Sequence, residues 1–226
     1  MSITDRYEEI WERSKNACQR SHRKPDEVLL IAVTKTHPPE IIKEAYDLGL
    51  RDFGENRVQE LLKKKEVLDS ELSIHNSNWH LIGQLQSNKA KYIAPFIHLV
   101  HSIDSLSTAK ELSLRAEQHS RKIDILVEVN VAAEESKSGI SSASLSKFLD
   151  ELSQDAPSLI VKGLMTVAPY NNDPETTRPY FATLRTLAEK HSLKELSMGM
   201  SNDFEVAIEE GATMVRVGSA LFGERG

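Results

Sequence analysis

The sequence predicts a single α/β domain in which eight parallel strands close into a (β/α)8 TIM barrel. Short apolar segments alternate with helical patterns along all 226 residues. The apolar segments recur at intervals of roughly 18 to 38 residues, near the ~30 residues of one βαβ unit. The first one is followed by TKTHPPE, which lacks the glycine-rich fingerprint of a doubly wound open sheet, the alternative fold.

An extra helix precedes the first strand, because residues 3–21 carry apolar or small side chains at helical spacing. The other helical patterns cover residues 40–48, 58–68, 88–93, 105–119, 144–153, 177–191 and 203–210. The predicted strands cover residues 28–33, 52–54, 79–84, 98–102, 123–131, 160–167, 195–198 and 214–217. Neither a linker nor a low-complexity segment interrupts this order, so we expect one domain over residues 1–226.

Composition argues against several classes of function. The formal net charge of −6 disfavours general nucleic-acid binding, and Cys18 is the single cysteine, so no internal disulfide and no CxxC site exist. No segment approaches the roughly 18 uninterrupted apolar residues of a membrane span, and the N-terminus does not resemble a signal peptide. We therefore expect a cytoplasmic protein that binds neither nucleic acid, nor membranes, nor a metal ion.

Polar residues gather where the predicted strands end, and in barrels the site lies at the carboxyl ends of the strands. Lys35 follows the apolar segment LLIAV of the first strand, and Asn56 follows the second strand in GENR. The seventh strand ends in MGMSND, which contains Ser201, and the eighth in RVGSALFG, which begins at Arg216. We expect these segments to meet in one site.

The segments after the seventh and eighth strands predict a phosphate site. Ser201 or Asn202 is placed to cap the helix at residues 203–210, and Gly218 and Ser219 are placed to open a short final helix. Backbone N–H groups and hydroxyls at such helix starts bind anions, and glycine lets the backbone come close. The alternative for each serine alone is capping or turn formation without a ligand.

Lys35 is a candidate nucleophile. Burial disfavours the charged form of an amine and lowers its pKa, and a neutral amine condenses with carbonyl compounds. A lysine beside a phosphate site therefore predicts a phosphorylated carbonyl ligand. The alternative, which the residue pattern alone favours, is a lysine that reaches the solvent or pairs with an acid such as Glu55.

Other polar residues receive structural interpretations. We expect KKK at residues 63–65 to form the solvated face of a helix, and Lys137 to be a solvated loop lysine rather than a second ligand contact. For His80, a core histidine with a satisfied hydrogen bond is favoured over a ligand contact. His98 and His101 are expected to face opposite ways on one strand, so they form no metal pair.

Eight segments, in chain order, carry a resemblance to a known family: AVTKTH, DFGENRVQE, WHLIGQLQSNK, VHSIDS, VEVNVAAEESKSG, GLMTVAP, LSMGMSNDFEVAIEEG and MVRVGSALFGER. With these segments the chain resembles the YggS/PROSC family of pyridoxal phosphate homeostasis proteins over nearly its whole length. The resemblance implies a barrel like the N-terminal domain of alanine racemase, a fold type III domain. It also implies that Lys35 holds pyridoxal 5′-phosphate (PLP) as an imine.

The same resemblance assigns roles to further residues. Ser201, Gly218 and Ser219 hold the phosphate, Arg216 lies near the pyridine nitrogen, and Asn56 lines the ring pocket. Two departures are mild: Arg57 stands where many relatives have an aromatic residue, and Ser219 where many have threonine.

Three functional hypotheses follow. The resemblance favours a non-catalytic protein that buffers PLP or delivers it to PLP-dependent apoenzymes. Arg216, which will not readily protonate the ring nitrogen, would limit carbanion chemistry at this site. We also expect a monomer without the second domain of alanine racemase, since the sequence ends at Gly226. The alternative is a PLP-dependent amino-acid racemase. The third is an aldolase that uses Lys35 directly on a sugar phosphate, which has no ring nitrogen for Arg216.

Overall fold

The computed structural model describes residues 1–72, 74–134 and 137–223, and its centre is a closed parallel barrel. The barrel strands run in the order β4-β3-β2-β1-β9-β8-β7-β5, and β5 pairs with β4 to close the ring. Their bounds are β1 (Leu29–Val33), β2 (Asp52–Glu55), β3 (Asn78–Leu81), β4 (Leu99–Ile103), β5 (Ile123–Asn130), β7 (Leu159–Met165), β8 (Glu195–Met200) and β9 (Met214–Val217).

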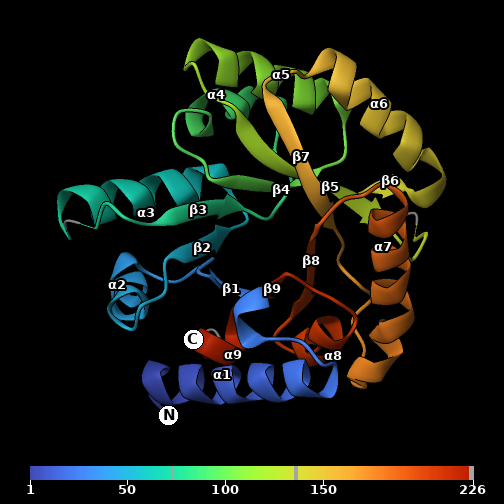
Figure 1. The fold of residues 1–226 in the computed structure, drawn as a ribbon. Helices are drawn as coiled ribbons and strands as arrows, with labels where there is room; N and C mark the ends of the chain where they lie inside the picture. The colour runs from blue at the N-terminus through green and yellow to red at the C-terminus, as the bar shows by residue number, and fades with distance from the viewer. Residues whose placement is uncertain (73, 135–136, 224–226) are drawn as a thin grey trace.

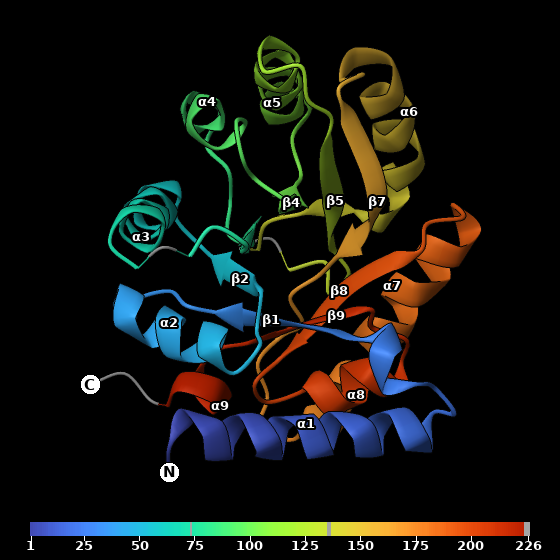
Figure 2. The same ribbon diagram turned by 60° about the vertical axis from the view of Figure 1, so that its left-hand side comes forward.

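Helices surround the barrel, as Figures 1 and 2 show from two directions. Their bounds are α1 (Ile3–Arg20), α2 (Pro39–Asp47), α3 (Val58–Ser70), α4 (Ala90–Ile93), α5 (Leu106–Gln118), α6 (Leu145–Asp155), α7 (Arg178–Lys190), α8 (Phe204–Glu209) and α9 (Ser219–Phe222). Short 3-10 helices cover Pro25–Glu27, Ser87–Lys89, Ser142–Ser144 and Pro174–Thr177.

The predicted barrel and its order of elements are confirmed. Each of the eight predicted strands is present with bounds that differ by three residues or fewer; the strand predicted over residues 79–84 is the most shifted, since β3 ends at Leu81. The sequence did not predict β6 (Ile140–Ser141), which pairs with the end of β5 outside the barrel ring. Two residues are too few to show the apolar alternation that predicts a strand.

The extra helix α1 begins with a capping box. The Ser2 hydroxyl accepts from the Asp5 N–H at 3.1 Å, and the Ser2 N–H donates to the Asp5 carboxylate at 2.8 Å. The helix buries one face, which includes Ile10 and Cys18, and packs against α8 and α9 (Figure 1). It therefore supports the elements that follow the seventh and eighth barrel strands.

The core combines a large apolar cluster between barrel and helices with buried polar groups on the strands, at the strand ends and on α3. The buried polar residues that matter below are Thr34, Glu55, Lys64, His80, His101, Ser197 and Arg216. No helix in the described ranges is both long and apolar enough to cross a bilayer. Because burial of a polar group is costly unless it is hydrogen-bonded, each of these residues needs a partner inside the protein.

Candidate functional site

One cavity of about 400 Å³ opens at the carboxyl ends of the strands. The six residues that the sequence singled out all line it: Lys35, Asn56, Ser201, Arg216, Gly218 and Ser219. They come from four separate strand ends, those of β1, β2, β8 and β9. The topology therefore brings together residues that lie as much as 184 positions apart in the chain (219 − 35).

Lys35 stands in a tight turn after β1. Its neighbour Thr34 is fully buried, and the Thr34 N–H donates to the Gly54 carbonyl at 3.0 Å. Thr36 has a φ of 68°, a left-handed conformation that is unfavourable for a β-branched residue. The Thr36 N–H donates to the Glu60 carboxylate at 2.5 Å, and this bond holds the turn. The backbone around Lys35 is thus fixed on both sides.

The support of this turn includes a buried ion pair. Lys64 Nζ lies 2.6 Å from Glu55 Oε1 and 2.7 Å from Glu60 Oε1, and it donates to the Thr34 carbonyl at 2.6 Å. The Thr34 hydroxyl also donates to Glu55 Oε1 at 2.6 Å. Burial raises the pKa of Glu55, although Lys64 and Thr34 oppose the rise. Helix α3 and strands β1 and β2 therefore meet in one buried polar cluster.

The prediction that residues 63–65 form a solvated face is wrong for Lys64, which is buried, and right for Lys63, which is exposed. Val58, Leu61 and Leu68 are the buried apolar residues of α3, and Lys64 lies on the same helical stripe. Three consecutive lysines indicate a solvent-exposed surface, and this pattern led to the wrong prediction for Lys64. The spacing of the apolar residues was the signal that could have found it.

Ser201 lies at the end of the cavity that the residues following β8 and β9 form. The Ser201 hydroxyl oxygen accepts from the N–H groups of Gly218 at 3.3 Å and Ala220 at 3.2 Å. A Cβ on Gly218 would lie 3.3 Å from the carbonyl oxygen of Val33, so a side chain there would crowd β1. Glycine thus lets the chain after β9 lie against the strand that carries Lys35.

The expected capping role of Ser201 or Asn202 is wrong. The residue at the N-cap of α8 is Asp203, whose carboxylate accepts from the Met200 N–H at 2.7 Å. Asn202 instead donates to the Asn171 carbonyl at 2.9 Å. Helix α8 begins at Phe204, one residue later than predicted, so Asp203 takes the N-cap position. Ser201 instead bonds to the start of α9.

Arg216 is 4% exposed, and its guanidinium is held by two hydrogen bonds. Nη1 donates to the Ser197 hydroxyl at 2.6 Å, and Nη2 donates to the Thr166 carbonyl at 2.9 Å. Burial lowers the pKa of Arg216 to about 10, with the Asp203 and Glu128 carboxylates opposing. The group therefore stays positive at neutral pH and brings a fixed cation to the cavity wall.

A smaller cavity of about 290 Å³ borders the first and shares Val167 with it. Glu128 and Lys137 line it, and Lys137 Nζ pairs with Glu134 at 3.1 Å. The pKa of Glu128 is raised to about 7 by burial and by the Asp104 carboxylate, while Arg216 opposes the rise. Glu128 was not among the predicted site residues; the signal that could have found it is an acidic residue within the apolar segment ILVEVN of β5.

His80 is fully buried, and its expected role as a hydrogen-bonded core histidine is confirmed. Its ring joins Asp52 at 3.0 Å and His101 at 2.9 Å. Atoms of Asp52, His80 and His98 that could ligate a metal ion lie within 4.8 Å of one another, but Asp52 and His80 already form a hydrogen bond with each other. The absence of a metal site stays a prediction.

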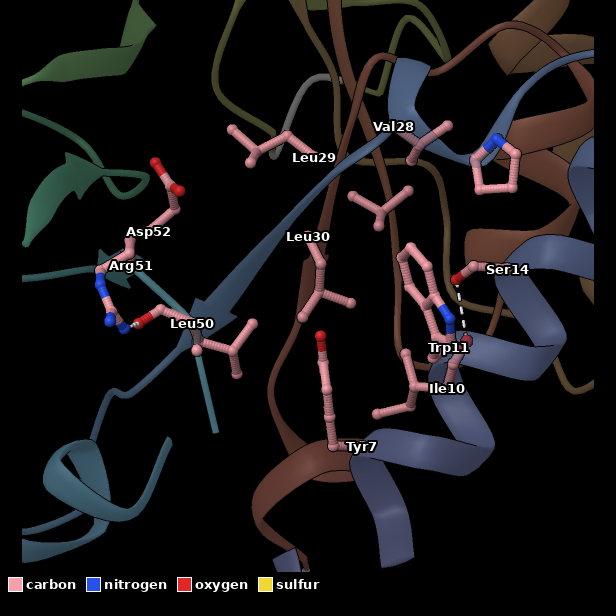
Figure 3. A pocket seen from close by; sticks show the side chains of 13 residues that line it. Tyr7, Ile10, Trp11, Ser14, Val28, Leu29, Leu30, Leu50, Arg51 and Asp52 are labelled. Carbon is pink, nitrogen blue, oxygen red and sulfur yellow. Dashed lines mark hydrogen bonds between the residues drawn. The ribbon is translucent and has the colours of Figure 1, made fainter. Parts of the chain in front are cut away.

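A third cavity, of about 260 Å³, lies near the amino ends of β1 and β2. Figure 3 shows Tyr7, Trp11 and Leu30 around it, with Asp52 at its edge. Two of its polar side chains bond within the protein: the Ser14 hydroxyl donates to the Ile10 carbonyl, and Arg51 Nη1 donates to the carbonyls of Tyr46 and Leu50.

The comparisons with known proteins agree with this geometry. The model of the family "Alanine racemase, N-terminal domain" matches residues 10–226. The chain is 46% identical to the pyridoxal phosphate homeostasis protein of Aquifex aeolicus over 100% of this chain and 99% of that protein. The protein of the same name from Escherichia coli K12 is 37% identical over 96% of this chain and 94% of that protein.

The chain belongs to the pyridoxal phosphate homeostasis protein family. Another protein like it, PipY of Synechococcus elongatus, has been solved without PLP and with PLP bound. The PLP-bound PipY is 39% identical, covers 95% of this chain and 100% of its own, and has a TM-score of 0.79. The alanine racemase of Clostridium difficile shares the fold, with a TM-score of 0.71 at 13% identity over 95% of this chain and 55% of its own.

Proposed function

We propose that this member of the pyridoxal phosphate homeostasis protein family binds PLP in the carboxyl-end cavity and serves as a carrier. The observation behind the proposal is the meeting of an amine, hydroxyls and a guanidinium in one cavity, at Lys35, Ser201, Ser219 and Arg216. When bound, PLP supplies an aldehyde that condenses with amines and a ring that withdraws electrons. The PLP bound in the relative PipY supports the same assignment.

The donor set of this chain fits the cofactor from end to end. Ser201 Oγ already accepts two backbone N–H groups, so its own O–H is left to donate to a phosphate oxygen. Gly218 lets the chain after β9 lie against Val33 of β1, and the Ser219 hydroxyl adds a donor beside it. At the other end, the amine of Lys35 would hold the aldehyde carbon as an imine, and Asn56 would line the ring.

Arg216 favours the carrier role. A guanidinium donates hydrogen bonds and does not readily give up a proton, so the pyridine nitrogen facing it would stay unprotonated. An unprotonated ring withdraws electrons weakly and gives little stabilisation to a carbanion. Arg216 therefore permits tight binding while it limits chemistry on the cofactor.

One observation favours the alternative, a PLP-dependent amino-acid racemase. Glu128 lies in the bordering cavity and has a pKa of about 7, so at neutral pH its carboxyl group can either give or take a proton. Racemisation requires such a group to exchange the α-proton of an amino acid. The two functions therefore differ in a measurable reaction.

The test uses the PLP-loaded protein in two assays. In the first, L-alanine and other L-amino acids are incubated in deuterium oxide, and a carrier leaves the α-proton in place. In the second, the loaded protein is mixed with the apo-form of a PLP-dependent aminotransferase, and aminotransferase activity should appear.

A phosphatase that destroys free PLP is added to a parallel sample of the second assay. Activity that survives the phosphatase indicates direct delivery, and activity that disappears indicates release and buffering. Deuterium incorporation that Glu128→Gln abolishes would overturn the carrier proposal in favour of the racemase.

A further inference from the structure

A chain of hydrogen bonds runs from Arg216 to Asp52 through the inside of the barrel. Arg216 Nη1 donates to Ser197 Oγ at 2.6 Å, and Ser197 Oγ lies 2.8 Å from His101 Nδ1. His101 Nε2 lies 2.9 Å from His80 Nδ1, and His80 Nε2 lies 3.0 Å from Asp52 Oδ1. The chain thus links β9, β8, β4, β3 and β2.

The chain is buried for most of its length. Ser197, His80 and His101 are fully buried, and Arg216 is nearly so. Asp52 keeps 13% of its side chain exposed, at the edge of the cavity near the amino ends of the strands (Figure 3). The positive end of the chain therefore lies in the carboxyl-end cavity and the negative end at the opposite end of the barrel.

The two ends fix the direction of every bond between them. A guanidinium has only donors and a carboxylate only acceptors, whereas a hydroxyl or a neutral imidazole has one of each to offer along the chain. Asp52 requires a proton on His80 Nε2, which leaves His80 Nδ1 to accept from His101 Nε2. His101 Nδ1 then accepts from the Ser197 hydroxyl, whose oxygen accepts from Arg216. No donor meets a donor anywhere along this path.

Both histidines must be neutral for these bond directions to hold, and their surroundings favour this state. Burial lowers the pKa of His101 well below its ordinary value, and the neighbouring His80, Arg216 and His98 lower it further. Burial also lowers the pKa of His80, helped by His98, while the Asp52 carboxylate opposes the change. Neutral imidazoles are therefore the forms that connect the two charged ends.

We propose that Ser197, His101, His80 and Asp52 are positioning residues for Arg216, which they hold in one orientation toward the ligand ring. The proposal rests on the proposed function, because it assumes that the ring nitrogen of PLP faces Arg216. The Thr166 carbonyl holds the second amino group of the guanidinium, so the chain and Thr166 together leave it little freedom to rotate. A buried polar path of this kind costs desolvation that an apolar barrel interior would avoid.

The first test needs no cofactor. In the ligand-free protein with 15N-labelled histidine, NMR at neutral pH should show His80 and His101 protonated at Nε2 and unprotonated at Nδ1. A charged imidazole, or a proton on Nδ1 of either ring, would overturn the directed chain. Because PLP takes no part, this result is independent of whether the proposed function holds.

The second test measures the ring nitrogen of bound PLP. Ser197→Ala removes the link to Arg216, and we expect about tenfold weaker PLP binding, the effect of roughly one lost hydrogen bond to a charged group, and a changed 15N shift of the pyridine nitrogen. Ser197→Thr keeps the hydroxyl and should restore both. Asp52→Asn, at the partly exposed end, should also alter the shift and the pH profile of the visible absorption.

Asp124→Asn is the matched control, because Asp124 also lies near the start of a barrel strand but pairs with Lys162 at 3.5 Å, outside the chain. It should leave the shift and the pH profile unchanged. If Ser197→Ala does not fold, the comparison of Asp52→Asn with Asp124→Asn decides whether the hydrogen-bonded residues position Arg216. The proposal would be overturned if Ser197→Ala and Asp52→Asn showed the same ring-nitrogen shift and pH profile as wild type and Asp124→Asn. A wild-type protein that takes up no PLP would overturn the proposed function instead.

Discussion

Glu128 carries a carboxyl group whose charge changes near neutral pH. It lies on β5 between Val127 and Val129, which are both buried, and is itself 8% exposed. The sequence shows a strand with this alternation, but it does not show that the face with Glu128 is enclosed by the other strands of the barrel. The positions of Lys35 and Arg216 at the cavity were predictable because each lies near the end of a strand among polar residues: Lys35 stands between two threonines after β1, and Arg216 lies in β9 just before Gly218 and Ser219.

The raised pKa of Glu128 predicts a stability that depends on pH. The folded-state pKa of about 7 exceeds the ordinary value of 4.5, so folding favours the protonated form, and stability falls as the pH rises from the lower value through the higher one. Glu128→Gln removes this loss. We expect no change in the free energy of unfolding at about pH 4 and a gain of up to about 3 kcal/mol at about pH 8.

Urea unfolding at both pH values checks this expectation. The control Glu189→Gln replaces an exposed carboxylate of α7, and its effect on the free energy of unfolding should be similar at the two pH values. A Glu128→Gln effect of equal size at both pH values would show that the carboxyl group does not titrate between them.

At the scale of elements, α3 is attached to the barrel by charge as well as by apolar packing. The Lys64 ammonium bonds to the Thr34 carbonyl of the chain that leaves β1 and to the Glu55 carboxylate at the end of β2. The helix itself was predictable from its apolar spacing, whereas its buried ion pair was not. The pair requires the relative placement of three elements, which single-sequence periodicity does not contain.

Lys64→Met should therefore destabilise the protein by about 3 kcal/mol or more, because it leaves the Glu55 carboxylate buried without its cation. The loss should be largest at about pH 8 and smaller at about pH 5, since a buried Glu55 without Lys64 would take up a proton. Lys63→Met, at the adjacent exposed position, should change stability by less than about 0.5 kcal/mol. Chemical unfolding of both variants measures the difference, and equal losses would refute a special role of Lys64.

At the scale of the whole molecule, the strand order and the closed barrel were predictable because alternating strands and helices allow few arrangements. The interior of the barrel was less accessible. His80, His101 and Ser197 lie on three strands, and each looks unremarkable in its own segment. Only the closure of the barrel places them in one line with Arg216. The single domain, the monomeric state and the cytoplasmic location stay predictions.

The central claim is that Lys35 holds PLP, and covalent trapping tests it most directly. The protein is loaded with PLP, reduced with borohydride, digested and mapped by mass spectrometry. We expect a reduced pyridoxal phosphate label on Lys35 and loss of this label in Lys35→Ala. A protein that gains no visible absorption with PLP, or that carries the label on another lysine while Lys35 stays unmodified, would contradict it.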